Sequence, residues 1–171
     1  MRTLSLFILV ALLSGKAAST TVQTPQPHTV LDYYLLLPKK YFEANDEERV
    51  KWMLDPRRGA IVDVKNGYLY APGDGAQTDV YVCLFKKPDG SYLIAVKTHP
   101  PDTDEYTYLD FYVFREGTLL DVTKTVLPVN VKEELKYELP RYGTTIHVKN
   151  NSGRKIYDLL WASTRFTLKR G

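Results

Sequence analysis

Few residues in this 171-residue chain could carry out catalysis or hold a metal ion, and they are widely spaced. The three histidines are His28, His99 and His147, and none stands at the short spacing from a second ligand that zinc sites use. His99 precedes Asp102 and Asp104, and these three side chains could form a hydrolytic or metal cluster. Because prolines interrupt this polar segment, we expect a solvated loop instead. The sequence therefore predicts no catalytic residue of this type, no metal and no cofactor.

One thiol is available for nucleophilic catalysis, and its position argues against that use. Cys83 lies between Val82 and Leu84 in a strand-like segment, where burial raises the pKa of a thiol and hides the thiolate. No serine stands in the Gly-x-Ser-x-Gly turn that presents a catalytic hydroxyl. We expect Cys83 to pack in the core, and with no second cysteine the chain has no internal disulfide.

Carboxylates offer the remaining route to catalysis. Asp63, Asp110, Asp121 and Asp158 lie in strand-like segments, although strand interiors usually disfavour aspartate. Two such carboxylates facing one cleft, about 5–10 Å apart, could hydrolyse a glycosidic bond. The simpler interpretation is that they mark a solvated sheet face or protect sheet edges. A hydrolase of envelope polymers that uses Asp63, Asp110 or Asp121 is one alternative function.

Tyrosine is the abundant residue whose chemistry suits binding, with 13 copies in the chain. A phenol combines apolar area with a polar tip, which suits half-buried strands and interaction surfaces alike. Several tyrosines flank predicted turns or fall on the polar side of a predicted strand. The sequence thus predicts a binding surface that includes Tyr68, Tyr70, Tyr108, Tyr112 and Tyr142.

The first 19 residues have the order of a secretory signal peptide. Arg2 is followed by an apolar run from Leu4 to Leu13 and by small residues up to Ser19. The run is too short to span a bilayer as a helix. We therefore expect residues 1–19 to be removed and residues 20–28 to form a flexible leader. Residues 29–171 should form one globular domain that is secreted or periplasmic.

The charge balance excludes partners that bind mainly through electrostatics. The net charge is +3, but two of the 23 basic residues, Arg2 and Lys16, leave with the signal peptide. The mature chain is then close to neutral against its 20 acidic residues, so we expect no binding to nucleic acid. No second long apolar run follows, and we expect no membrane span in the mature chain.

Two helices are predicted at the start of the domain. Thr29 can cap the first helix, with Asp32 as the acidic half of a capping box, and Pro38 should end it. Because this segment is apolar nearly all round, we expect it to be deeply packed. A second helix should begin after Asn45 and end before Pro56.

From Ala60 onward the apolar period changes to two, which predicts strands joined by tight turns. Asn66–Gly67 is the strongest short hairpin signal. Residues 79–86 carry apolar side chains on both faces, so this strand should be central and covered on both sides. Residues 131–139 allow a short helix, but we expect extended chain. The predicted strands are 61–64, 68–70, 79–86, 91–98, 107–115, 119–125, 144–149 and 155–168.

These elements predict an α+β fold, in which one or two N-terminal helices pack on an antiparallel β-meander of about six to eight strands. Tyr108, Asp110 and Tyr112 alternate with apolar residues and should lie on a solvated face. Export, the lack of a catalytic constellation and the tyrosines favour a non-enzymatic binding domain whose partner is a protein or an envelope glycan. A carrier of a small ligand or glycan, with a pocket between helices and sheet, is a further alternative beside the hydrolase.

Overall fold

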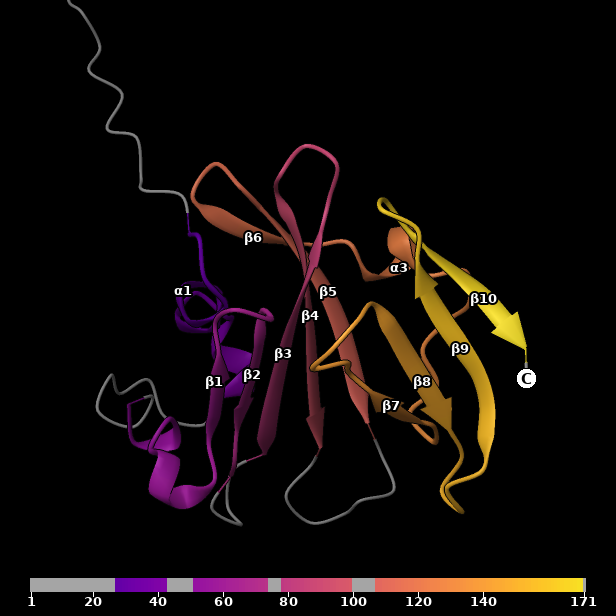
Figure 1. Ribbon diagram of the computed structural model, residues 1–171, viewed down its shortest axis with the longest axis horizontal. Helices are drawn as coiled ribbons and strands as arrows, with labels where there is room; N and C mark the ends of the chain where they lie inside the picture. Colours follow the sequence, from indigo (N-terminus) through magenta and orange to yellow (C-terminus); the bar gives the residue numbers. More distant parts are fainter. Residues whose placement is uncertain (1–26, 43–50, 74–77, 100–106, 171) are drawn as a thin grey trace, which may run out of the picture.

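The computed structural model describes residues 27–42, 51–73, 78–99 and 107–170 (Figure 1). The predicted signal peptide lies outside the described residues, as do most of the leader, the predicted Asn45 cap, and Asp102 and Asp104. Within the described part of the chain, no helix is both long enough and apolar enough to cross a membrane.

In the described part of the chain, ten strands form two antiparallel sheets, which we call the first sheet and the second sheet. The first sheet has six strands that follow one another in chain order, each paired with the next. The antiparallel sheet character of the predicted α+β fold is confirmed, and the described helices are few and short. The strands of the first sheet are β1 (Ile61–Asp63), β2 (Tyr68–Ala71), β3 (Asp79–Lys86), β4 (Tyr92–His99), β5 (Tyr108–Arg115) and β6 (Thr118–Asp121).

The second sheet has four strands in the order β10-β9-β8-β7, whereas the sequence predicted one sheet of about six to eight strands. The predicted strand 155–168 is in fact two strands, because residues 162–165 form a turn in which Ser163 has a φ of 68°. The strands of the second sheet are β7 (Lys136–Glu138), β8 (Thr145–Lys149), β9 (Lys155–Trp161) and β10 (Phe166–Arg170).

The chain leaves the first sheet through α3 (Thr123–Val126), where the sequence predicted that a strand would continue to residue 125. The Asp121 carboxylate accepts a hydrogen bond from the Thr123 N–H at 2.9 Å. The Thr123 hydroxyl in turn accepts from the Phe111 N–H of β5 at 2.8 Å. These side-chain bonds replace the next backbone bond of the sheet, so the chain can turn away after Asp121.

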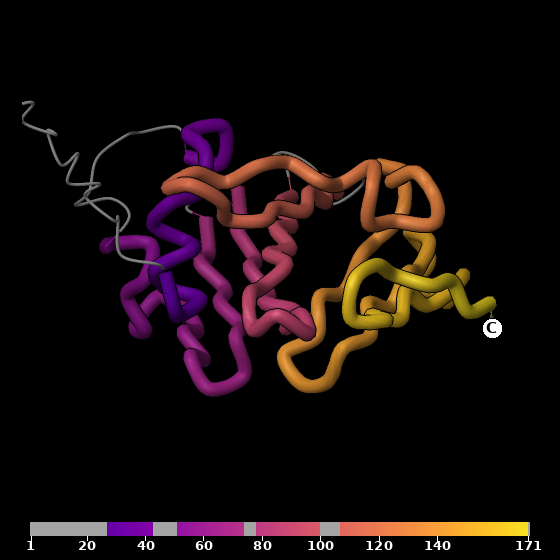
Figure 2. The backbone as a smooth tube through the Cα atoms, turned by 90° about the horizontal axis from the view of Figure 1, so that it is seen from above, coloured from indigo at the N-terminus to yellow at the C-terminus, as the bar shows by residue number. Residues whose placement is uncertain are grey.

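Two apolar clusters cover opposite faces of the first sheet. Between the sheets, Phe85 and Phe111 pack with Phe166 of β10. On the other face, Val82 packs in a cluster that contains Tyr34 of α1 (Val30–Leu35). The prediction that residues 79–86 are covered on both sides is therefore confirmed. In Figure 2 the N-terminal elements lie on one side of the molecule and the C-terminal strands on the other.

The predicted start of the first helix is confirmed. The Thr29 hydroxyl accepts from the Asp32 N–H at 3.2 Å, and the Asp32 carboxylate accepts from the Thr29 N–H at 2.8 Å. These reciprocal bonds are a capping box. The short turn η1 (Lys39–Tyr41) follows Pro38. Residues 51–53 are helical, and a second turn, η2 (Pro56–Arg58), ends that segment near the predicted stop.

Candidate functional site

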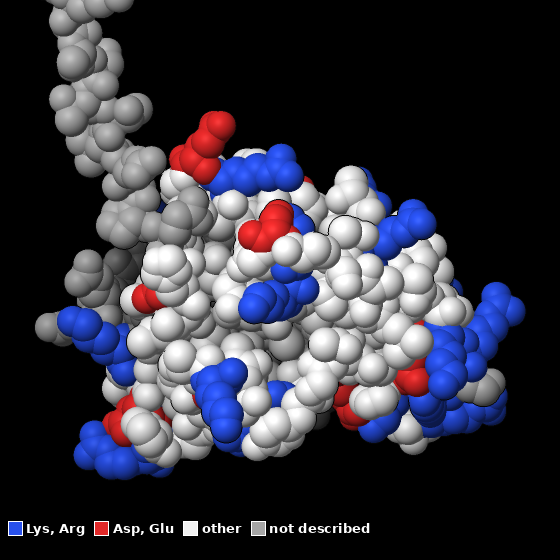
Figure 3. Space-filling view, turned by 45° about the horizontal axis from the view of Figure 1, so that its top comes forward, with Lys and Arg blue, Asp and Glu red and all other residues white. Residues whose placement is uncertain are grey.

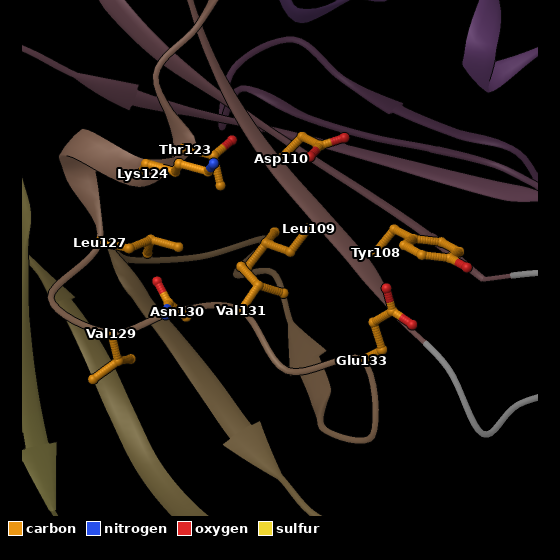
Figure 4. Close-up of a pocket in the computed structure, with 10 residues that line it drawn as sticks. All are labelled: Tyr108, Leu109, Asp110, Thr123, Lys124, Leu127, Val129, Asn130, Val131 and Glu133. Atoms are coloured by element: carbon orange, nitrogen blue, oxygen red, sulfur yellow. The ribbon is translucent and has the colours of Figure 1, made fainter.

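A groove of about 520 Å³ opens beside the first half of β5 (Figure 4). It lies between β5, α3 and the connection of residues 127–133 that leads towards β7. Its volume is in the range of pockets that accept a small molecule or a short segment of chain. Its lining residues are Tyr108, Leu109, Asp110, Thr123, Lys124, Leu127, Val129, Asn130, Val131 and Glu133.

The groove exists because β5 is only partly paired along its outer edge. β6 pairs with the second half of β5, from Tyr112 to Arg115. Beyond that pairing, the Phe111 carbonyl accepts from the Val122 N–H at 2.8 Å. At the other end of β5, the Thr107 N–H donates to the Glu133 carbonyl at 2.9 Å. The connection is thus tied to β5 at both ends and stands away from it in between.

Leu109 lies in this gap, midway between Thr107 and Phe111. Because hydrogen-bonding direction alternates along an antiparallel strand, its backbone N–H and C=O point to the same outer edge as those of Thr107 and Phe111. Neither group has a hydrogen-bond partner among the described residues. This backbone donor and acceptor therefore lie on the outer edge of β5 along the groove, where Leu109 as a whole residue is only 2% exposed.

The floor of the groove is apolar and its rim carries charges of both signs. Leu109, Leu127 and Val131 belong to the cluster between the sheets. Lys124 and Glu133 stand at opposite ends of the groove in Figure 4, and neither forms an ion pair with another described residue. A bound molecule would meet a cation at one end, an anion at the other, and apolar surface in between.

Asp110 lines the groove from β5, but its carboxylate points away from the centre in Figure 4. It accepts from Lys40 Nζ at 2.7 Å and from the Tyr41 hydroxyl, and the Tyr41 and Tyr112 hydroxyls lie 2.8 Å apart. Burial, together with the Asp110 charge, raises the pKa of Tyr41 far above its usual value. This cluster fastens η1 to β5, so Asp110 is engaged before any ligand arrives.

Of the five predicted binding tyrosines, only Tyr108 lines the groove, and it is 45% exposed. Tyr112, four residues further along β5, is only 3% exposed. The prediction that Tyr112 lies on a solvated face is wrong, because the Tyr41 ring packs against it edge to face at 6.3 Å. A contact with a partner would require Tyr41 to move first.

The other three predicted tyrosines lie elsewhere. Tyr68 is buried between the sheets, and Tyr70 is half-buried with its ring stacked on Tyr81 at 4.6 Å. Tyr142 is 70% exposed and lines a separate hollow of about 450 Å³ at residues 138–147. The structure therefore does not bring the five tyrosines together on one surface.

The predicted carboxylates are also separated and individually engaged. Asp63 accepts from Arg141 Nε at 2.8 Å and from the Asn66 amide, and these bonds lower its pKa. It lies on β1, three intervening strands away from Asp110 on β5. Asp121 bonds the Thr123 N–H at the start of α3. No two of these three carboxylates line a common described cavity.

His147 and the predicted strand carboxylate Asp158 form a pair on the outer face of the second sheet. His147 faces away from its buried neighbours Ile146 and Val148, as predicted, and its Nδ1 lies 2.7 Å from Asp158 Oδ1. Lys155 Nζ donates to the other oxygen of Asp158 at 2.6 Å, and both partners lower the pKa of Asp158. The pair adjoins the hollow at Tyr142, which His147 also lines.

Sequence reasoning missed two features of the molecule, the free edge at Leu109 and the burial of Lys97. The free edge depends on where β6 ends, and the side-chain hydrogen bonds of Asp121 and Thr123 determine that end. Lys97 could have been found from the period of two, because it shares a face of β4 with the buried Leu93 and Ala95.

No metal centre or reactive thiol emerges from the described residues. They contain no group of three His, Cys, Asp or Glu side chains that could hold a metal ion. Cys83 Sγ donates to the Pro140 carbonyl at 3.3 Å, and burial raises its pKa to about 12. A thiol with so high a pKa is not a nucleophile near neutral pH.

On the face of the molecule shown in Figure 3, most side chains are uncharged, and basic and acidic groups both occur around them. No single sign of charge dominates the middle of that face, so electrostatics alone does not mark a site there. Comparison of the chain with protein-family models, with curated proteins and with solved structures found no match.

Proposed function

We propose that the protein is a binding domain that holds an extended peptide segment of a partner protein in the groove beside β5. The observation that carries this proposal is the outer edge of β5 at Leu109, whose backbone N–H and C=O have no hydrogen-bond partner among the described residues, beside the apolar lining of the groove. An extended peptide adds to a free sheet edge through main-chain hydrogen bonds, and pockets for its side chains supply specificity.

The geometry limits what the groove accepts. The bonds at Phe111 and Thr107 close the edge on both sides of Leu109, so the groove fits a short segment rather than a long added strand. One apolar side chain of that segment would rest on Leu127 and Val131. An acidic residue would lie towards Lys124 and a basic residue towards Glu133. If the domain is exported as the sequence predicts, the partner is a secreted or envelope protein.

The carrier of a small ligand has weaker support. Among the described cavities, one of about 290 Å³ touches both the α1 segment and the first sheet, with Tyr33, Tyr92 and Phe114 in its lining. It is smaller than the groove, and most of the α1–sheet contact is filled by the buried side chains of Tyr34, Val82 and Val96. The groove is therefore the better candidate for ligand binding.

A selection from random peptides tests the proposal while the natural partner is unidentified. Heptapeptides displayed on phage would be selected on the mature chain, residues 20–171, and the winners measured by fluorescence anisotropy. We expect winners with an apolar residue flanked by one acidic and one basic residue. Val129→Asp places a charge at the groove and should weaken binding by about tenfold, or ~1.4 kcal/mol.

Two controls keep the test specific. Ile156→Asp is the matched control, because Ile156 is 37% exposed and Val129 is 38% exposed, and Ile156 does not line the groove. The pair of reversals Lys124→Glu and Glu133→Lys should invert the order of charges in the selected peptides. Failure to enrich any peptide would refute the proposal, as would winners whose affinity is indifferent to both Val129→Asp and the charge reversal.

A further inference from the structure

The charges of this chain are divided unevenly between its two parts. Residues 136–170, which contain the second sheet, include eight basic and two acidic residues, an excess of six positive charges. Residues 20–135 include 13 basic and 18 acidic residues, an excess of five negative charges. The near-neutral total of the mature chain therefore hides a strongly basic second sheet. In Figure 3 a group of Lys and Arg side chains lies at the right, at the end of the molecule where Figure 1 shows β9 and β10.

Three lysines form a row across neighbouring strands of the second sheet. Lys136 of β7 lies opposite Lys149 of β8, and Lys149 lies opposite Lys155 of β9. Because neighbouring strands are about 4.8 Å apart, the row extends over roughly 10 Å. Lys136 and Lys149 alternate with side chains that are buried between the sheets, so the row lies on the outer face.

Folding gives no reason for this row, because like charges directly opposite each other on neighbouring strands destabilise a sheet. The two acids of the region offset the repulsion only in part. The Glu138 carboxylate accepts from Lys149 Nζ at 2.6 Å, and the Asp158 carboxylate accepts from Lys155 Nζ at 2.6 Å. Lys136 forms no ion pair with a described residue. Local arrangements that cost stability in this way are expected at functional sites, and here the function would be to bind anions.

Further cations surround one end of the row. Arg154 precedes Lys155 in the turn between β8 and β9, and Lys169 and Arg170 end β10 where it pairs with the first half of β9. Arg154, Lys169 and Arg170 are exposed, and none forms an ion pair with a described residue. We call this surface the basic end, and it consists of Lys136, Lys149, Arg154, Lys155, Lys169 and Arg170.

We propose that the basic end binds a linear acidic polysaccharide. The amines of the row are aligned, so a chain that repeats its negative charge from sugar to sugar contacts several of them at once. Each further contact is then made within one complex, which raises the overall affinity without any single strong contact. Lysine amines are compact charges that accept sulfate or carboxylate groups without a fixed geometry.

The surroundings favour a polysaccharide over a membrane or a nucleic acid. Proteins that attach to a membrane surface combine cations with apolar side chains that enter the lipid. Within β7, β8, β9 and β10, Ile156 is the only large apolar side chain that is exposed. Single-stranded nucleic acids stack their bases on accessible aromatic rings, and no aromatic ring of these four strands is exposed.

A charged polymer and its neutral parent test the proposal. The mature chain, residues 20–171, would be titrated into fluorescein-labelled dextran sulfate and into labelled dextran of the same length, and binding followed by fluorescence anisotropy. We expect binding to dextran sulfate and none to dextran. The affinity should fall by at least tenfold between about 50 mM and about 500 mM NaCl, because salt screens contacts between exposed charges.

Matched variants locate the contact. Lys136→Gln, Lys149→Gln and Lys155→Gln combined remove the row and should weaken binding by about tenfold. The control replaces three exposed lysines outside the second sheet by glutamine, which changes the net charge equally and should leave binding within about twofold of wild type. The control positions are Lys39, Lys65 and Lys86. Lys136→Gln alone breaks no ion pair and should weaken binding by about twofold to threefold, which keeps the test valid if the triple variant does not fold.

Three results would overturn the proposal. Equal binding by the two triple variants would mean that net charge acts and not the row. Dextran sulfate binding no stronger than dextran binding would exclude an acidic polymer. Tighter binding to phosphatidylglycerol vesicles, or to a short single-stranded DNA, would assign the basic end to another partner. None of these results bears on peptide binding, because no residue of the basic end lines the groove beside β5.

Discussion

At the scale of single residues, a buried ionisable group makes folding depend on pH. The folded state holds the pKa of Lys97 near 8, whereas the unfolded chain returns it to about 10.5. The unfolded state therefore binds more protons between these values, so this group's contribution to stability rises with pH across that window. Below pH 8 the Lys97 amine is charged in both states, so the full free-energy cost of burying that charge lowers the stability of the folded protein.

Replacing Lys97 with methionine should remove this penalty. We expect Lys97→Met to be more stable than wild type at pH 7 by roughly 3 kcal/mol, which is the pKa shift converted at about 1.4 kcal/mol per unit. The advantage should shrink as the pH rises from 8 to 10.5. Urea unfolding of both proteins at pH 7 and pH 10 measures this difference, and an advantage that is the same at both pH values would show that Lys97 is not destabilised by its charge.

At the scale of elements, the hairpin between β5 and β6 contains a residue in an unfavourable conformation. Glu116 has a φ of 50° and Gly117 a φ of 82°, so both central residues of the two-residue turn are left-handed. Such turns favour Asn-Gly, because glutamate has a steric penalty in this region that asparagine largely escapes.

We expect Glu116→Asn to stabilise the protein by about 1 kcal/mol without changing the sheet. Chemical unfolding with the same denaturant slope in both proteins would establish this. Glu116→Gln serves as the control, since it removes the charge without the preference for a left-handed φ. Equal stabilisation by both substitutions would assign the effect to charge and contradict the conformational explanation.

Elements that depend on local signals were predictable from the sequence, and those that depend on contacts across the sheet were not. The Thr29–Asp32 capping box and the bounds of β3 follow from neighbouring residues. Asn66–Gly67 does lie in a turn, but the Asp63–Tyr68 pairing makes it a four-residue loop. α3 depends on the Thr123 hydroxyl reaching Phe111, twelve residues away in the chain, and no periodic pattern reveals that bond.

The candidate site was hard to predict for the same reason. Tyr108 was identified by its place on a strand, and it does line the groove. The free edge at Leu109, however, is a property of backbone pairing and not of side-chain type. Tyr112 was misjudged because a period of two shows which residues share a face, but it cannot show that Tyr41 covers that face.

At the scale of the whole molecule, one aromatic cluster joins the two sheets. Phe166 of β10 lies 5.1 Å from the Phe85 ring and 5.2 Å from the Phe111 ring of the first sheet, measured between ring centres. The Trp161 ring also packs on the Phe166 ring, with 5.1 Å between ring centres, and Trp161 Nε1 donates a hydrogen bond to the Lys86 carbonyl at 2.9 Å. These contacts make the second sheet the cover of the inner face of the first.

Phe166→Ala should therefore destabilise the whole domain by about 3–5 kcal/mol, the usual effect of removing a buried aromatic ring. Thermal unfolding followed by circular dichroism and by tryptophan fluorescence should give one shared, lowered midpoint. Leu36→Ala, at a residue that is 44% exposed, should shift it little. Two separate transitions in Phe166→Ala would mean that the sheets unfold independently and that the cluster does not couple them.

The chain-order pairing of both sheets also has a consequence for how the protein reaches its folded state. Each strand finds its partner in the adjacent strand of the chain, so the loops to be closed are short and pairing can proceed from the N-terminal end as the chain emerges. The strands β7 to β9 cover part of the inner face of the first sheet, and the cover is complete only when the last strand arrives with Phe166. During synthesis, the part of this surface that Phe166 covers is thus the last to be buried, and a chain cut short before β10 would expose it to aggregation or proteolysis.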